Sequence, residues 1–231
     1  MNKSEELKRL AAVAAVEEIK SGMTLGLGTG STANYAIEEI GKRIAAGMLS
    51  DIHGIPSSVR TENLARAVGI PLLTFDDCQT LDLTIDGADE IDPLLRLIKG
   101  GGGALLREKV LAQASARFIV IADESKISDA LGEKWALPVE VVPFAWKAEV
   151  RFIETLGAKT KLRVSAGGPP ILTDQRNFLL DCDFGRMNNP DEIAARLSSR
   201  AGIVEHGLFI GLASQAIIAG TDGIRRIEAK V

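Results

Sequence analysis

In the first part of the chain, segments whose apolar residues have helical spacing alternate with short apolar runs that are typical of buried strands. Residues 5–19 place apolar side chains three and four positions apart, which predicts a helix with Ser4 as its N-cap. Further helices are expected over residues 33–44 and 61–68, and strands over 23–28, 51–55, 70–75, 81–86 and 117–122. This order predicts an α/β fold with an open, mostly parallel, doubly wound sheet.

The pattern changes after residue 135. Strands are expected over residues 139–143, 160–164 and 177–181, and helices over 145–156 and 190–199. We therefore predict a smaller α+β domain over residues 136–206. Residues 207–211 resemble the earlier apolar strands, so we expect residues 207–231 to return to the first domain, which covers residues 1–135.

The amino-acid composition argues against nucleic acid and membranes as binding partners. The chain has 231 residues, of which only 4% are aromatic, so the core must be mostly aliphatic and aromatic platforms for nucleic acid are not expected. The net charge is −4 and the two signs are interspersed, without the basic stripe that nucleic acid or an anionic membrane favours. No apolar run approaches the length of a membrane span, and no signal-peptide pattern precedes the first helix.

The few cysteines and histidines argue against a metal centre. Cys78 and Cys182 are far apart and form neither a disulfide framework nor a metal-binding pattern, which fits a reducing cytoplasm. His53 and His206 are the only histidines, so a histidine-rich metal site is excluded. We expect the cysteines and His206 to be structural.

The most unusual segment contains four consecutive glycines. Lys99 precedes Gly100, Gly101, Gly102 and Gly103, and a run typical of a helix follows, with Glu108 in its first turns. Such a segment is costly to order, which makes sense where backbone amides must lie against a ligand. The alternative is a flexible linker. With Glu108 as proton acceptor, the segment suits a reaction in which an oxyanion develops, although most helix glutamates are merely solvated.

Three other polar clusters also follow apolar runs. They are residues 29–32, residues 86–90 and residues 123–126. In an open α/β sheet the carboxyl ends of parallel strands share one edge, where ligands bind. We therefore expect these three clusters and the glycine segment to form one composite site.

The first of these clusters contains glycines and hydroxyl residues. Residues 26–32 read Gly-Leu-Gly-Thr-Gly-Ser-Thr, and Ser31 occupies the position where a dinucleotide fingerprint needs its third glycine. Hydroxyls beside the free amides of a helix start instead favour a single phosphate. A dinucleotide site or a purely structural turn are the alternatives.

The second cluster and the two residues after it place four carboxylates within residues 86–92. One interpretation is a Mg²⁺ or Ca²⁺ site, although the spacing is not that of an EF-hand. We favour hydrogen bonding to sugar hydroxyls or proton transfer for Asp86 and Asp89, and capping of turns for Glu90 and Asp92. The alternative is an acidic turn in which Asp89 or Asp92 is only a helix or turn cap. Lys126, and Lys8 in the first helix, are candidates for pairing with phosphate; for Lys8 the alternative is a solvated surface lysine.

Together these motifs resemble the ribose-5-phosphate isomerase A family. The resemblance runs through residues 26–33, 86–90, 99–109, 121–126 and 137–141, and extends to residues 207–209. It implies a Rossmann-like domain, with a small α+β domain placed before the C-terminal strand. It also implies interconversion of ribose 5-phosphate and ribulose 5-phosphate in the non-oxidative pentose phosphate pathway, with no metal or organic cofactor, by an enzyme that is commonly a homodimer or homotetramer.

The resemblance also implies roles for particular residues. Glu108 is the base that moves a proton between C2 and C1 through an enediolate. Asp86, Asp89 and Lys99 assist ring opening and proton transfer among the sugar oxygens. The residues expected to bind substrate are Lys8, Thr29, Gly30, Ser31, Thr32, Gly87, Ala88, Gly100, Gly101, Gly102 and Lys126.

Three rival functions fit parts of the pattern. A coenzyme A transferase would use a glutamate as a covalent nucleophile. A regulatory module would bind sugar phosphate without turnover, although the chain lacks a basic helix-turn-helix segment. A nicotinamide-dependent dehydrogenase would need the missing third glycine.

Overall fold

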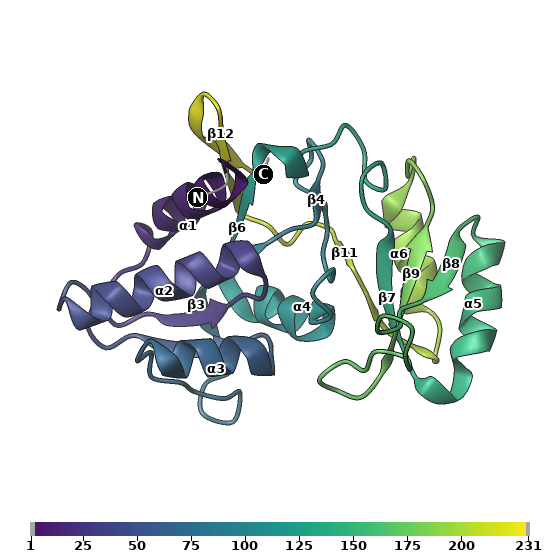
Figure 1. Cartoon of the computed structure of the whole chain (residues 1–231), viewed down its shortest axis with the longest axis horizontal. Helices are drawn as coiled ribbons and strands as arrows, with labels where there is room; N and C mark the ends of the chain where they lie inside the picture. The colour runs from purple at the N-terminus through teal and green to yellow at the C-terminus, as the bar shows by residue number, and fades with distance from the viewer. Residues whose placement is uncertain (1–2, 230–231) are drawn as a thin grey trace. The chain divides into compact units, whose positions relative to one another are not determined.

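The computed structural model describes residues 3–229, and the chain divides into two compact units (Figure 1). Unit 1 is formed by Met1–Ala88, Arg107–Lys126 and Leu212–Val231. Unit 2 is formed by Asp89–Leu106 and Ile127–Gly211. The chain therefore crosses between the units several times, and each unit contains segments that are distant in sequence.

Unit 1 contains a six-stranded sheet in the order β13-β12-β6-β3-β1-β2. All neighbouring strands are parallel except β13, which pairs antiparallel with β12. The strands are β1 (Thr24–Leu27), β2 (His53–Pro56), β3 (Leu81–Gly87), β6 (Ser115–Asp123), β12 (Gln215–Gly220) and β13 (Gly223–Glu228). The expected open, mostly parallel sheet is confirmed.

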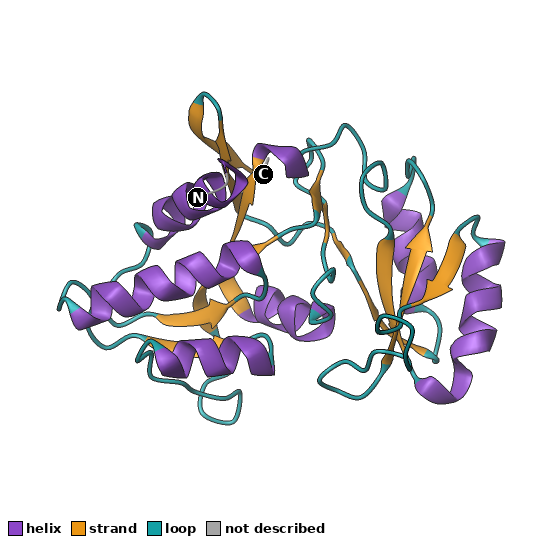
Figure 2. Ribbon diagram, in the orientation of Figure 1, coloured by secondary structure: helices purple, strands orange, loops and turns teal. Residues whose placement is uncertain are grey.

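Helices pack on this sheet (Figure 2). They are α1 (Lys3–Val16), α2 (Ser31–Ala45), α3 (Val59–Ala67) and α4 (Leu105–Ala114), and a short 3₁₀ helix, η1 (Glu124–Lys126), follows β6. Alternate strand residues such as Leu25, Leu83 and Ile119 join the alanines of α1 and Ile37 of α2 in one aliphatic core. This small-residue core follows from the low aromatic content.

Unit 2 contains two antiparallel sheets. A four-stranded sheet has the order β10-β7-β9-β8, and a three-stranded sheet has the order β11-β5-β4. The strands are β4 (Glu90–Ile91), β5 (Leu97–Ile98), β7 (Leu137–Val141), β8 (Lys159–Leu162), β9 (Phe178–Asp183), β10 (Ile203–His206) and β11 (Leu208–Phe209). A 3₁₀ turn η2 (Pro143–Ala145) and the helices α5 (Trp146–Thr155) and α6 (Pro190–Ser198) complete the unit.

The division of the chain differs from the expected boundaries at 135 and 207. Residues 89–106 and 127–135 belong to unit 2, because β4 and β5 pair with each other rather than with the parallel sheet. Residues 207–211 also belong to unit 2, since β11 pairs antiparallel with β5. The chain returns to unit 1 later, at β12 beside β6.

Two other local predictions were wrong. Residues 70–75 form no strand: Leu72 makes a single bridge to Gly54, and Pro71 has no amide hydrogen with which to extend a ladder. The first helix includes Ser4, which is therefore not its N-cap, and it ends at Val16. A turn in which the Glu18 amide donates to the Ala15 carbonyl follows that end.

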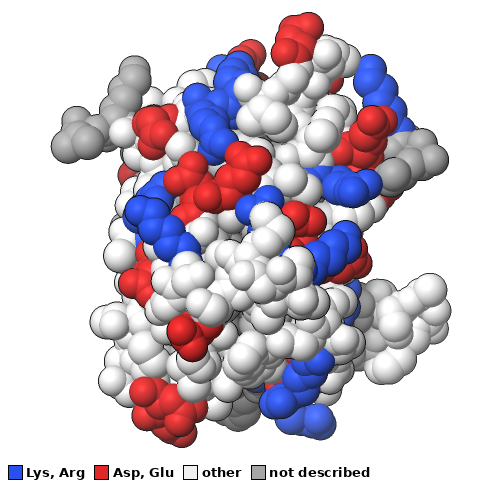
Figure 3. All heavy atoms as spheres, turned by 90° about the vertical axis from the view of Figure 1, so that its left-hand side faces the viewer, with Lys and Arg blue, Asp and Glu red and all other residues white. Residues whose placement is uncertain are grey.

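Charge on the surface is mixed, as the composition predicts. Figure 3 shows basic and acidic side chains interspersed on one face of the molecule. In the part of the chain that the structure describes, no helix is long and apolar enough to cross a membrane. Cys182 lies in the core of unit 2, and burial raises the pKa of its thiol to about 12, so the thiol stays protonated.

Glu90 joins two segments of unit 2. Its side chain is fully buried, and its carboxylate accepts hydrogen bonds from the amides of Gly132, Glu133, Lys134 and Trp135, at 2.9–3.2 Å. The expectation that Glu90 acts as a cap is thus confirmed, but it caps a loop more than 40 positions away in sequence. This single carboxylate holds the three-stranded sheet to the segment that precedes β7.

Replacing Glu90 with glutamine should destabilise the protein. The amide nitrogen of the new side chain cannot accept a hydrogen bond, so backbone donors in the loop lose their acceptor, at a cost of about 1–3 kcal/mol or more. Thermal or urea unfolding measures this change, with the exposed Glu154→Gln as a matched control that stays within about 0.5 kcal/mol of the wild type. Equal stability of the two variants would contradict the proposed anchor.

Glu140 on β7 is a buried acid with an internal network. Burial raises the pKa of its carboxyl, and the nearby Glu205 and Asp174 add to that rise. Hydrogen bonds from Asn177 and Thr173, both at 2.8 Å, act in the opposite direction. Because the folded-state pKa is raised, stability from this group is present below the unfolded-state value and is lost as pH rises through the folded-state value.

Glu140→Gln removes this ionisation while retaining the shape of the side chain. We expect the variant to gain stability relative to the wild type as pH rises from about 4.5 to about 7.5, the range that begins near the ordinary pKa of a glutamate and extends above it. Thermal unfolding across that pH range measures the difference. A stability difference between the two proteins that does not change with pH would show that the Glu140 ionisation carries no such cost.

Candidate active site

A cluster of hydroxyl groups holds the loop between β1 and α2. The Thr29 side chain is buried, and its hydroxyl lies 2.7–2.9 Å from those of Ser57, Ser58 and Thr61. The Thr61 hydroxyl donates to the Gly28 carbonyl at 2.8 Å. Thr29 therefore directs its hydroxyl into the protein, so its side chain fixes the loop rather than facing outward.

The start of α2 has the properties of an anion site. Gly30 is the N-cap, with a φ of 120° that favours glycine, and it provides no side-chain cap. The first amides of α2, which begins at Ser31, therefore have no acceptor from the N-cap residue. Free amides and the positive end of the helix dipole favour a phosphate at this position.

Asp86 links this loop to the neighbouring strand. It lies near the end of β3 with 1% of its surface exposed, and its Oδ1 accepts from the amides of Thr29 at 3.0 Å and Gly87 at 2.7 Å. A Cβ on Gly28 would overlap the Asp86 carboxylate, so glycine is required there for close approach of the two strands. Asp86 thus connects the predicted polar cluster at residues 29–32 to its own cluster at the end of β3.

The four acidic residues of the segment 86–92 do not converge. Asp89 accepts from the Gly101 amide at 2.7 Å, whereas Glu90 binds the loop that precedes β7. Asp92 accepts from the amides of Leu94 and Arg96, which confirms its expected role as a turn cap. Within residues 3–229, no group of three or more potential ligands is arranged to hold a metal. The acidic segment is therefore a set of separate backbone anchors.

The glycine loop follows β5, not a strand of the parallel sheet, so the expected common sheet edge holds only for the other three clusters. Lys99 is 2% exposed; its amide donates to the Gly207 carbonyl and its Nζ lies 5.4 Å from the centre of the Phe209 ring. The Gly103 amide donates to the Gly100 carbonyl, which closes a turn. The loop is therefore ordered by its own unit and does not behave as a linker.

Individual loop positions require glycine. A Cβ on Gly101 would lie 2.7 Å from Asp89 Oδ1 and 2.9 Å from the Trp135 ring. The Gly101 amide is already bound to Asp89, whereas those of Gly100 and Gly102 have no acceptor among the described residues. These two amides are the loop donors left for a ligand.

Glu108 lies in the first turn of α4 and is 3% exposed. It is therefore not a solvated helix glutamate, and its carboxylate is shielded from bulk water. Burial at the start of a helix, directly after an open glycine loop, suits a carboxylate that must reach substrate rather than solvent. Of the predicted catalytic residues Asp86, Lys99 and Glu108 are all buried, and Asp89 is partly exposed.

Lys8 is positioned by a small network between α1 and α2. Its Nζ lies 2.7 Å from Glu5 Oε1, and Tyr35, one turn into α2, donates to Glu5 Oε2 at 2.6 Å. The hydrogen bond from Lys8, followed by that from Tyr35, lowers the pKa of Glu5, so Glu5 stays ionised. Lys8 is thus linked through Glu5 to Tyr35 in α2. Lys126, at the end of η1, is partly exposed.

Sequence reasoning missed several residues that support this site. They are Glu5, Tyr35, Ser57, Ser58, Thr61 and Arg163. Serine and threonine before a helix are ordinary capping residues, and Ser58 does cap α3, so the sequence pattern contains no signal for their contact with Thr29.

The six-stranded, mostly parallel sheet, with ligand-type loops at its strand ends, places the chain among α/β enzymes. Within that class, the profile of ribose 5-phosphate isomerase A (phosphoriboisomerase A) matches residues 53–223. The chain belongs to this family.

Relatives and solved structures agree. A protein of Desulfatibacillum aliphaticivorans named ribose-5-phosphate isomerase A is 56% identical over 229 residues, covering 99% of this chain and all of the relative. The protein of the same name in Chloroflexus aurantiacus is 54% identical over 224 residues, which cover 97% of this chain and 94% of the relative.

Among solved structures, a D-ribose-5-phosphate isomerase in complex with phospho-erythronic acid has a TM-score of 0.96 at 39% identity, covering 99% of this chain and all of that one. The ribose 5-phosphate isomerase A of Methanocaldococcus jannaschii has a TM-score of 0.92 at 36% identity, covering 97% and 99%. The expected combination of a Rossmann-like domain and a smaller α+β domain is therefore confirmed.

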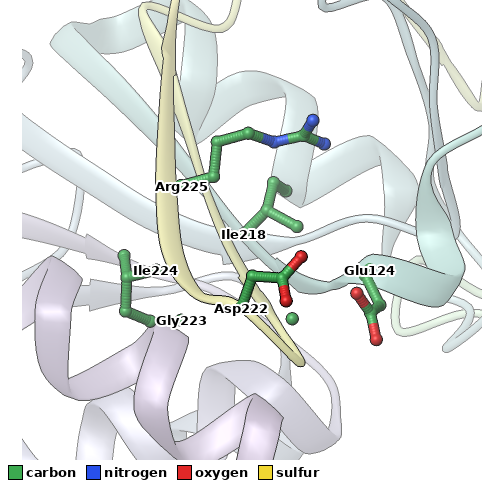
Figure 4. Close-up of a pocket in the computed structure, with 7 residues that line it drawn as sticks. Glu124, Ile218, Asp222, Gly223, Ile224 and Arg225 are labelled. Atoms are coloured by element: carbon green, nitrogen blue, oxygen red, sulfur yellow. The ribbon is translucent and has the colours of Figure 1, made fainter.

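A separate pocket lies at the β12–β13 hairpin of unit 1 (Figure 4). Its volume is about 200 Å³, and Glu124, Asp222 and Arg225 are among its lining residues. Glu124 belongs to the predicted cluster at residues 123–126, but none of the residues assigned a catalytic or substrate-binding role lines this pocket, and its mixed charges do not select one type of ligand. The predicted site thus does not coincide with this hollow.

Gly28→Ala should destabilise the loop that Asp86 supports. The new methyl group displaces the Asp86 carboxylate, and the amides of Thr29 and Gly87 lose their acceptor, at about 1–3 kcal/mol. Gly87→Ala is a matched control, since a Cβ there meets its nearest atom at 3.8 Å. Thermal unfolding of both variants tests the contact, and equal losses of stability would contradict it.

Proposed function

We propose that the chain interconverts D-ribose 5-phosphate and D-ribulose 5-phosphate as an aldose–ketose isomerase, using Glu108 as its base. The observation that carries the proposal is the burial of Glu108 in the first turn of α4, after a loop with unoccupied amides. Family membership supports the substrate, because the relatives above bear the name of this enzyme over nearly the whole chain. The related complex with phospho-erythronic acid adds support, since that compound is a phosphorylated sugar acid.

Proton transfer accounts for the whole reaction. In the open-chain aldose, the Glu108 carboxylate removes the proton from C2, and the electron pair moves through the new C1–C2 double bond to the carbonyl oxygen at C1. The resulting enediolate is protonated at C1 by the Glu108 carboxylic acid, while the proton of the C2 hydroxyl passes to the oxygen at C1, so that C1 carries the hydroxyl and C2 becomes the carbonyl. No electron acceptor is consumed, since one carbon is reduced as the other is oxidised.

The developing oxyanion needs donors that are fixed before the reaction. In the proposal the Gly100 and Gly102 amides supply them, and the Lys99 ammonium adds positive charge. The Gly101 amide is bound to Asp89, so its part is to orient that carboxylate. Asp86, Asp89 and Lys99 assist ring opening and the proton transfers among sugar oxygens.

The phosphate is assigned to the start of α2. Gly30, Ser31 and Thr32 supply amides and hydroxyls, with Lys8 and Lys126 as cations. Thr29 acts through the hydroxyl cluster that shapes the loop, which modifies its expected role as a direct ligand. Gly87 and Ala88 contact substrate through their backbone. A homodimer or homotetramer remains part of the proposal.

Glu108→Gln should lower kcat by about 10²–10⁴-fold or more, because a neutral amide cannot accept the C2 proton. Ketose formation from ribose 5-phosphate, measured in EDTA, tests this, and the wild-type rate should be unchanged by the chelator. The exposed Glu154→Gln serves as a control with wild-type activity.

Two outcomes separate the parts of this proposal. Full activity in Glu108→Gln would be compatible with isomerase activity but would contradict the role of Glu108 as the base. Saturable binding of ribose 5-phosphate by the wild type without turnover would indicate a sugar-phosphate sensor instead.

A further inference from the structure

Arg163 connects the four-stranded sheet of unit 2 to the glycine loop. It follows β8 directly, and its Nη1 donates to the carbonyl oxygens of Gly100 at 3.1 Å and Gly101 at 3.2 Å. The rest of the guanidinium is bound to Asp181 on β9, with Nε donating to Oδ2 at 3.0 Å and Nη2 donating to Oδ1. One planar group thus bridges a carboxylate and two loop peptides.

The arginine is itself held firmly. Its amide donates to the Leu179 carbonyl at 2.8 Å, and its carbonyl accepts from the Ile171 amide at 3.0 Å. The side chain is only 16% exposed. Because backbone and guanidinium are both fixed, the two hydrogen bonds from Nη1 to the loop are preorganised, and little entropy remains to be lost when a ligand binds.

Each of the two carbonyl groups shares its peptide with the amide of the next glycine in the loop. The Gly100 carbonyl shares its peptide with the Gly101 amide, which donates to Asp89. The Gly101 carbonyl shares its peptide with the Gly102 amide, one of the two loop donors left for a ligand. A hydrogen bond to a carbonyl polarises the whole peptide and strengthens donation from its N–H group.

We propose that Arg163, oriented by Asp181, is a positioning residue that fixes and polarises the Gly100–Gly102 peptides for the oxyanion of the reaction. This inference rests on the proposed function, because it takes the Gly102 amide as an oxyanion donor. Arg163 itself touches no reacting atom and acts through the loop. A purely structural role, in which the arginine only ties β8 to the loop, predicts lost stability without a selective change in kcat.

Arg163→Met tests the proposal. We expect kcat to fall about tenfold to a hundredfold, less than the loss of an oxyanion donor outright, with KM within about threefold. Binding of phospho-erythronic acid should weaken as well, whereas competitive inhibition by inorganic phosphate should not change. Arg163→Lys should recover only part of kcat, since one ammonium cannot serve the carboxylate and both peptides.

Two further variants separate the loop contacts from the change in charge. Lys161→Met, two positions earlier on β8 and exposed, removes the same charge without touching the loop, and should keep wild-type kcat. Arg163→Met/Asp181→Asn removes both ionised partners. Its kcat should stay low, whereas recovery to the wild-type value would assign the defect to an unpaired Asp181 and overturn the proposal.

Hydrogen exchange distinguishes failure of this inference from failure of the proposed function. In the ligand-free protein, amides 100–103 should exchange faster in Arg163→Met than in the wild type and Lys161→Met. If the wild type does not isomerise ribose 5-phosphate, the proposed function is wrong. The exchange result then still tests whether Arg163 holds the glycine loop. Unchanged kcat and unchanged exchange in Arg163→Met would overturn the inference.

Discussion

The rest of the site depends on one constraint, the fixed orientation of the peptides at Gly100 and Gly101. Ordering four glycines costs conformational entropy. Hydrogen bonds to both the amide and the carbonyl groups hold this loop in place. Asp89 accepts from one amide, and the Arg163 guanidinium donates to two carbonyls. A Cβ on Gly101 would collide with Asp89, which holds the loop, and a Cβ on Gly100 would collide with Leu105, so side chains are not tolerated at these two positions.

The carboxylates of this chain show how similar groups acquire different tasks. Glu90 and Asp92 are buried and satisfied by backbone amides, so they hold segments together. Asp86 and Asp89 also bind amides, but each sits beside a ligand-type loop. Glu108 is buried in the first turn of the helix that follows the glycines. Position relative to the loops, rather than residue type, separates anchors from candidate catalysts.

Much of the fold could be predicted because alternating strands and amphipathic helices carry local signals. β1, β3 and β6 were expected within a few residues of their bounds, as was the run of elements from β7 to α6. The pairing of β5 was not predictable, since a two-residue strand in an apolar run carries no sign of its partner. Pro71 disrupted an apolar pattern that otherwise indicated a strand. Arg163 lies 62 positions from Gly101, so no local pattern could reveal the bond between them.

The central claim is proton transfer by a carboxylate whose acidic form exchanges with solvent. The direct test is to convert ribose 5-phosphate in D₂O and to measure deuterium at C1 of ribulose 5-phosphate by NMR. The account predicts deuterium at C1 in at least part of the product, because the proton on Glu108 is replaced before its delivery. Complete retention of the original C2 hydrogen, with no deuterium at C1, would contradict the account, in which the proton on Glu108 exchanges with solvent before its delivery.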